Sequence, residues 1–456
     1  LDVHHGLGTS SYDFGLYDQG VWLMSRFQAP FVTLMGRNLM GDHASFILVF
    51  LAPFYWLFPS AGTLFFFQSL GIGMGALPVF LYARKRLESE GIALALAICY
   101  LLHPAVGWTN RENFHPDAFL GFFVGMAIYG ALERKWRVYV VFLVLSLLVK
   151  EDASLVLVPL GVWVGVRRSW RYGVATIIAS LTFMVFAMFV VMRSLIGVPT
   201  RNGWRIPFGG PKGLIEEAIS RPGNVIQHFR SEDRPFYFWQ MTFPVAWVFA
   251  RAPSVALISL VVLGTNMLST FFYQYHIEYH YSLVAVPAIV IGTVYAIGFI
   301  ERHRRWVVAG VAFTSLWSCL MWGVVPVGRI LTLNSDDPIG RAAPPYWEPD
   351  YPSPVAAREL FPVIPAGAAV SAYHALDPHL THRTHIYQFP NPWRVVLYGP
   401  NTDLENIRAC LAEANDIDYV MLPSSLDDQQ QADWDIISAD FSVAASNDYW
   451  VVYERT

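Results

Sequence analysis

The sequence predicts an α-helical membrane protein with many spans, followed by a small α/β domain. Only 14% of its 456 residues are charged and 54% are hydrophobic, whereas an ordinary soluble domain carries about 25% charged residues. Several apolar runs approach the ~20 residues that cross a ~30 Å hydrocarbon core. They lie at residues 62–83, 172–192, 281–300 and 306–325.

Positive charges gather in short loops between the apolar runs. These basic clusters lie at residues 84–86, 134–137, 167–171 and 302–305. Cytoplasmic loops of membrane proteins are rich in Lys and Arg, so we expect these loops to face the cytoplasm. The run 62–83 then crosses from outside to inside, and the N-terminal stretch is extracytoplasmic.

Alternation from that start predicts about ten crossings and places the C-terminus outside as well. The expected spans are 62–83, 91–104, 117–132, 137–149, 153–166, 172–193, 237–250, 254–270, 281–300 and 306–325. One further span is expected before residue 1, because the chain opens in polar sequence without Met or a signal peptide. The predicted location is a bacterial or archaeal plasma membrane.

The chain divides into four predicted parts. Residues 1–43 form a first extracytoplasmic loop with short helices, and residues 44–325 form the transmembrane domain. The latter includes a short aromatic helix at 44–58 that lies in the membrane interface and a long outer loop at 194–236. A Pro-rich linker at 326–350 leads to an extracytoplasmic α/β domain at 351–456.

The outer loop around KEDASL indicates a functional cavity. Its apolar flanks hold only about 13 residues each before a basic cluster, or ~20 Å of helix, which does not cross a ~30 Å core. Lys150, Glu151 and Asp152 should therefore lie below the membrane surface, and ionisable residues at that depth usually mark function. The alternative is an internal ion pair that only fixes helix packing.

A pair of histidines raises the question of a metal. His276 and His280 lie four residues apart with Glu278 between them, which is metal-ligand spacing if the segment is helical. Two histidines can equally donate to a phosphate or form hydrogen bonds near the interface. No cofactor is certain from this pattern, and a divalent metal is one alternative.

Motifs in a fixed order carry a resemblance over essentially the whole chain. They are YDFGLYDQGVW, GRNLMGDHASF, an apolar run with Gln68, NFHPDAF, KEDASL and YHYSLVAVP. This order resembles a family of prokaryotic multi-spanning membrane proteins, a domain of unknown function. That family is similar to the C-type (GT-C) glycosyltransferases, which include protein O-mannosyltransferases and aminoarabinose transferases.

The resemblance implies a transferase that moves a sugar from a polyprenyl-phosphate donor to an extracytoplasmic acceptor, a hydroxyl of a glycan, lipid or protein. The lipid bilayer is a further partner, and no nucleic acid is expected. In the resembled class a carboxylate of the first outer loop is the general base. Here that residue is Asp13, with Asp18 as second choice; Phe14 stands where the O-mannosyltransferase pattern has a second acid.

The chemistry asks for few groups. A sugar phosphodiester has a good leaving group, so displacement needs a base for the acceptor hydroxyl and cations for the departing phosphate. Lys150 is a compact charge at cavity depth, with Glu151 and Asp152 to orient it or bind the sugar. Further candidates for binding the donor are His43, Arg111, His115, His280 and Tyr281.

Other interpretations remain open. Ser10 followed by Asp13 also resembles a capping box, in which Asp13 only stabilises a helix start. Charged residues inside a membrane also mark transport paths, so a transporter or permease is an alternative, although no internal repeat is visible. A third possibility is a non-catalytic membrane assembly subunit whose outer domain binds a partner.

Overall fold

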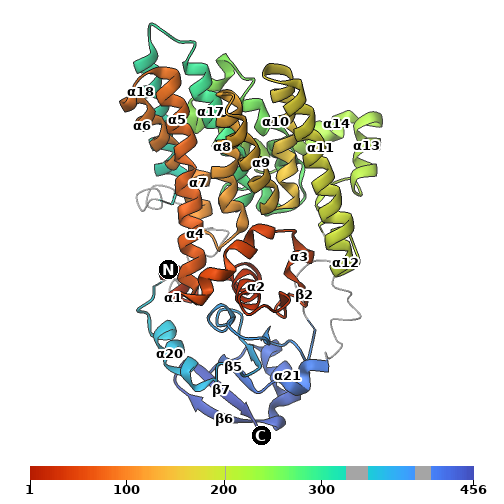
Figure 1. Ribbon diagram of the computed structural model, residues 1–456. Helices are drawn as coiled ribbons and strands as arrows, with labels where there is room; N and C mark the ends of the chain where they lie inside the picture. Colours follow the sequence, from red (N-terminus) through yellow and green to blue (C-terminus); the bar gives the residue numbers. More distant parts are fainter. Residues whose placement is uncertain (201, 325–347, 396–411) are drawn as a thin grey trace. The chain divides into compact units, whose positions relative to one another are not determined.

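The structure is a computed structural model that describes residues 1–200, 202–324, 348–395 and 412–456. The chain forms two compact units (Figure 1). Unit 1 combines Leu1–Asp42, Leu48–Phe65 and Ser335–Thr456, and unit 2 comprises His43–Ile47 and Phe66–Asn334. Most of the predicted linker 326–350 lies outside the described residues.

Unit 2 is a bundle of helices. Its main helices are α5 (Ala76–Leu87), which continues α4 (Ala61–Met74), α6 (Glu90–Leu101), α7 (Pro104–Arg111), α8 (Leu120–Leu132), α9 (Trp136–Val149), α10 (Ser154–Arg167), α11 (Trp170–Phe186), α12 (Arg193–Ile196), α13 (Pro211–Ser220), α14 (Pro222–Arg230), α15 (Arg234–Thr242), α16 (Leu260–Leu268), α17 (Val286–Ile297) and α18 (Arg304–Trp322). Helix α17 is the centre of the bundle: every residue from Val286 to Val294 is buried, and it packs against α5, α6 and α8.

Helices α10 and α11 pack at very short range. A Cβ atom added at Gly173 of α11 would lie 2.3 Å from the Cα atom of Gly165 in α10. Small residues allow this kind of backbone approach between membrane helices. The sequence therefore sets the spacing of this pair through its glycines.

Three helical stretches among the described residues are long and apolar enough to cross a membrane: Ala61–Leu87, Trp170–Ile196 and His280–Ile297. A fourth follows if α6 and α7, bent by 52°, count as one broken span. The expectation of about ten spans thus stays a prediction. Helices α9 and α10 have 14 residues each, or about 21 Å, so they are as short as the sequence indicated.

The predicted span at 237–250 is not one helix. Helix α15 ends at Thr242, a 3-10 turn covers Phe243–Val245, and Ala246 and Trp247 adopt positive φ of 51° and 52°. Pro244 inside this segment has no N–H to donate, which favours a break. The apolar periodicity alone did not reveal that break.

The C-terminal part of unit 1 contains the predicted α/β fold. Its sheet has the order β4-β3-β5-β7-β6, with β3 parallel to β4 and β5, and β7 antiparallel to β5 and β6. The strands are β3 (Val370–Ala372), β4 (Ile386–Gln388), β5 (Tyr419–Pro423), β6 (Phe441–Ser446) and β7 (Trp450–Arg455), with helices α20 (Pro352–Leu360) and α21 (Asp428–Ile437) beside them. Trp434 of α21 packs on Val420 and Phe441 of the sheet.

The N-terminal segment belongs to the same unit. It forms α1 (Asp2–His5), a π-helical turn at Ser11–Gly15, α2 (Leu16–Ser25), the hairpin β1 (Phe31–Val32) and β2 (Arg37–Asn38), α3 (Leu39–Asp42) and the 3-10 helix Ala52–Trp56. The 3-10 helix Phe46–Phe50 begins in unit 2 and ends in unit 1. The Thr33 hydroxyl accepts from Ile386 N–H at 3.0 Å and donates to the Ile386 carbonyl at 2.5 Å. Residues more than 350 positions apart thus share one core.

Replacing Gly173 by Ala should lower the melting temperature of the detergent-purified protein. The new Cβ forces α10 and α11 apart, and overpacking of this kind costs about 1–3 kcal/mol. Gly264→Ala in α16 is the matched control, because nothing lies within 4 Å of a Cβ there. An unchanged melting temperature for Gly173→Ala would contradict the close packing.

Candidate functional site

Lys150 is the centre of a buried charged cluster in unit 2. The residue has an extended backbone (φ −166°, ψ 150°) between α9 and a 3-10 turn at Glu151–Ala153. Its ammonium nitrogen lies 3.5 Å from Asp117 Oδ2 and 3.7 Å from Asp152 Oδ2. Lys150 is only 2% exposed, and a buried charge requires such partners.

Glu151 connects this turn to the segment around His43. Its Oε1 atom lies 2.7 Å from His43 Nδ1, and its Oε2 atom accepts from Ala44 N–H at 3.1 Å. Two of the predicted site residues are therefore paired with each other. Asp152 is more open than its neighbours, with 43% of its side chain exposed.

The side chains of Lys150 and Arg205 both lie near the ring of Tyr281. Lys150 Nζ lies 5.7 Å from the ring centroid, and the Arg205 guanidinium carbon lies at the same distance. Arg205 also approaches the Tyr281 hydroxyl at 3.4 Å and stacks over Phe271 at 4.1 Å. The long loop at 194–236 thus brings a guanidinium to the aromatic ring that Lys150 faces.

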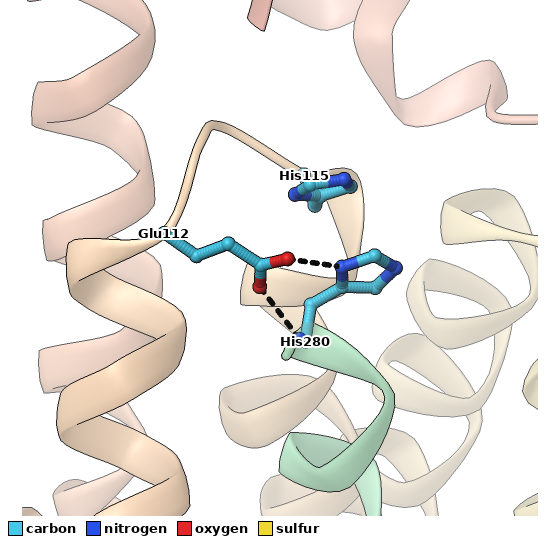
Figure 2. Close-up of side chains that lie close together, drawn as sticks. All are labelled: Glu112, His115 and His280. Carbon is cyan, nitrogen blue, oxygen red and sulfur yellow. Dashed lines mark hydrogen bonds and ion pairs between the residues drawn. The ribbon is translucent and has the colours of Figure 1, made fainter. Parts of the chain in front are cut away.

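A second cluster consists of Glu112, His115 and His280 (Figure 2). Glu112 Oε2 accepts from the His280 N–H at 2.6 Å, and Oε1 lies 3.2 Å from His280 Nδ1. The rings of His115 and His280 stack with centroids 3.7 Å apart. All three residues are at most 6% exposed, and their ligand atoms lie within 4.8 Å of one another, so they could hold a metal ion.

Gln68 of α4 forms hydrogen bonds with the turn that carries Glu112 and His115. Its amide donates to the carbonyls of Thr109, Asn110 and Glu112, and its Oε1 atom accepts from the His115 N–H at 3.1 Å. Arg111 is the last residue of α7 and directly precedes Glu112. The polar residue that interrupts an apolar run therefore shapes the path from α7 to Pro116.

His276 and His280 do not share one helical face. The segment forms two 3-10 turns, Phe272–Tyr275 and His280–Ala285, and both His276 and Tyr279 have extended backbones. The His276 ring stacks on Phe272 and lies 3.5 Å from Asp233, while Glu278 is half-buried. Of the predicted metal group, His280 alone belongs to the cluster with Glu112 and His115.

Asp18 is enclosed within unit 1. Tyr55 and Thr381 donate hydrogen bonds to its carboxylate, and His382 Nε2 lies 3.1 Å from Oδ2. Burial alone would raise the pKa of Asp18, but His382 and the two hydroxyls outweigh burial and lower that pKa. Asp18 is therefore an ionised carboxylate whose oxygens already have partners.

Asp13 has a different environment. It lies in the π-helical turn Ser11–Gly15 and is half-buried. Ser10 caps this turn by accepting from the Tyr12 N–H at 3.1 Å. Ser10 therefore caps this turn, while the role of Asp13 in a capping box stays a prediction, and Asp13 is more accessible than Asp18.

Three residues of unit 1, the buried His4 and Asp377 and the half-buried His379, were not singled out as site candidates from the sequence. The rings of His4 and His379 stack with centroids 4.0 Å apart. Asp377 accepts from the Ser11 hydroxyl at 3.0 Å. Burial raises the pKa of Asp377 well above its usual value, and burial together with His5 lowers the pKa of His379 to about 3. The density of histidines at 374–385 was the available signal, but the stacking of His379 on a residue from the start of the chain was not predictable.

The fold of this chain is similar to one that is known from crystal structures. Crystal structures of ArnT from Cupriavidus metallidurans, in the apo state and bound to undecaprenyl phosphate, match with a TM-score of 0.57 and 13% identity. Each match covers 98% of this chain and 93% or 94% of ArnT.

The sequence also identifies the family of this chain. Residues 3–456 match the family described as predicted membrane protein (DUF2079), so the chain belongs to that family. None of the curated proteins matches this chain. The resemblance found in the motifs is confirmed, both for the family and for its similarity to the C-type glycosyltransferases.

Acidification should destabilise unit 1 through His379. The pKa of this imidazole is about 3 in the folded state and about 6.5 when unfolded. The unfolded chain therefore binds more protons between these values, and stability falls by about 1.4 kcal/mol per pH unit as pH drops through that window. Melting temperatures of His379→Phe between pH 7 and 4 should fall less steeply than those of wild type. His385→Asn, at an exposed position, should match wild type; equal slopes for all three proteins would refute the assignment.

Proposed function

We propose that this protein is a membrane glycosyltransferase that moves a sugar from a polyprenyl-phosphate donor to an acceptor hydroxyl on the extracytoplasmic face. The observation that carries the proposal is the buried Lys150, which lies near the same Tyr281 ring as Arg205. The fold similarity to ArnT, which was crystallised with undecaprenyl phosphate, supports it.

In this proposal Lys150 binds the donor phosphate. An ammonium held between Asp117 and Asp152 is pre-positioned and needs no reorganisation when negative charge develops on the leaving phosphate. Arg205 offers a planar guanidinium that suits phosphate geometry. Asp152, with its exposed carboxylate, would bind sugar hydroxyls, and Glu151 and His43 would hold the turn in place.

The transfer step needs one base. The acceptor oxygen attacks the anomeric carbon, the bond from that carbon to the phosphate oxygen breaks, and the lipid phosphate leaves with the bonding pair. The acceptor proton passes to a carboxylate, for which Asp13 is the first choice. Asp18 is the weaker candidate, because Tyr55 and Thr381 already occupy its oxygens.

Lys150→Met should weaken binding of undecaprenyl phosphate, used here as the probe, by about 10- to 100-fold, the worth of a hydrogen bond to a charged group. Lys150→Arg should retain part of the affinity, because the charge remains. The control is Lys212→Met, whose side chain is 91% exposed. Wild-type affinity for a monodisperse Lys150→Met protein would remove Lys150 from the donor site.

Asp13→Asn distinguishes a base from a helix cap. If Asp13 is the general base, Asp13→Asn should lower turnover about 10²-fold or more while the protein still folds. If Asp13 only caps the helix, Asp13→Asn should lower the free energy of unfolding by about 1 kcal/mol and leave turnover unchanged. Turnover is measured as loss of labelled sugar from the polyprenyl-phosphate pool of membranes that contain each variant. Asp2→Asn, at an exposed position in α1, is the control.

A further inference from the structure

We propose that Glu112, His115 and His280 bind a divalent transition-metal ion, preferentially zinc, which joins the turn after α7 to the start of the 3-10 helix His280–Ala285. The proposal goes beyond sugar transfer and does not depend on it. The three side chains come from two segments about 165 positions apart and are all buried.

The spacing of the donor atoms is close to that of a metal site. Glu112 Oε1 and His280 Nδ1 are 3.2 Å apart, and two ligands of a tetrahedral zinc with bonds of 2.0–2.2 Å are separated by about 3.4 Å. The third ligand atom lies within 4.8 Å of the others.

A neighbouring carbonyl selects the required form of His115. Its Nδ1 atom lies 2.9 Å from the carbonyl oxygen of Asn113, so Nδ1 carries the proton and donates. The lone pair is then on Nε2. Metal-bound histidines generally donate their other ring N–H to a carbonyl or carboxylate in this way, which fixes both the tautomer and the ring orientation.

The donor types favour zinc over the harder cations. Two imidazoles and one carboxylate suit zinc and its first-row neighbours, whereas calcium and magnesium prefer oxygen ligands alone. Three protein ligands leave a fourth position for water or a substrate oxygen.

The charge balance of the surrounding core also favours a cation. Glu112 lies in a region that contains the carboxylates of Asp117, Glu151 and Asp152, and Lys150 pairs with two of these. The two clusters are close together, because the His280 ring lies 4.0 Å from the Tyr281 ring that Lys150 faces. A divalent ion at Glu112 would offset negative charge that is expensive to bury.

Metal binding would position the partners of Lys150. His115 precedes Asp117 by two residues, and the His280 and Tyr281 rings are 4.0 Å apart. Asp117 and Tyr281 both contact Lys150. An ion that fixes His115 and His280 therefore fixes two of the groups that hold the ammonium.

The experiment measures metal content of the full-length protein in detergent, after exposure to zinc and dialysis. We expect about one zinc per chain, an X-ray absorption spectrum with two imidazole nitrogens and carboxylate oxygen, and a higher melting temperature with zinc than after chelation. Glu112→Gln, His115→Asn and His280→Asn should each lose most of the bound zinc. His276→Asn is the matched control and should keep it.

Several results would overturn the site. They are a wild-type protein without zinc after loading, full zinc content in all three variants, or loss of zinc in His276→Asn. The wild-type spectrum decides the ligand set even if a variant fails to fold. Lys150→Met should retain zinc while losing affinity for undecaprenyl phosphate, so failure of the metal site and failure of the donor site are separate outcomes.

Discussion

The burial of one ammonium group constrains much of unit 2. An isolated charge at 2% exposure is costly by several kcal/mol, so the chain must supply carboxylates from other segments at the same depth. Asp117 comes from the 3-10 turn Pro116–Phe119 before α8, and Asp152 comes from the turn before α10. The positions of these helix ends follow from the need to reach Lys150.

The helix lengths satisfy this constraint. Helices α9 and α10 stop after 14 residues each, about 21 Å of helix, which is less than a full span. The irregular backbone of the turn between them is tolerated because protein surrounds it. The same turn supplies Glu151, whose pairing with His43 brings a segment from the start of the chain into unit 2.

The sequence predicted the parts of the site that depend on local pattern. The short apolar flanks indicated a deep Lys150, and the C-terminal sheet followed from its strand-like segments. Contacts between residues that are far apart in the chain could not be predicted from local sequence pattern. The contact of Glu112 with His280 spans 168 positions, and nothing in the sequence near HIEYH shows that its backbone is extended at His276. The enclosure of Asp18 by Thr381 and Tyr55 also depends on residues far away in the chain and had no local signal.

Unit 1 is assembled from three separated stretches of the chain, Leu1–Asp42, Leu48–Phe65 and Ser335–Thr456. During synthesis the first two stretches emerge long before the third. At about 5–20 residues per second, the roughly 300 residues from Phe65 to strand β3 take about 15–60 s to make. For that interval the carboxylate of Asp18 has no Thr381 beside it, and the hairpin β1–β2 has no strand β4 against Thr33. Residues 1–42 and 48–65 are thus among the last segments to reach their native environment, after the helices of unit 2 have been synthesised.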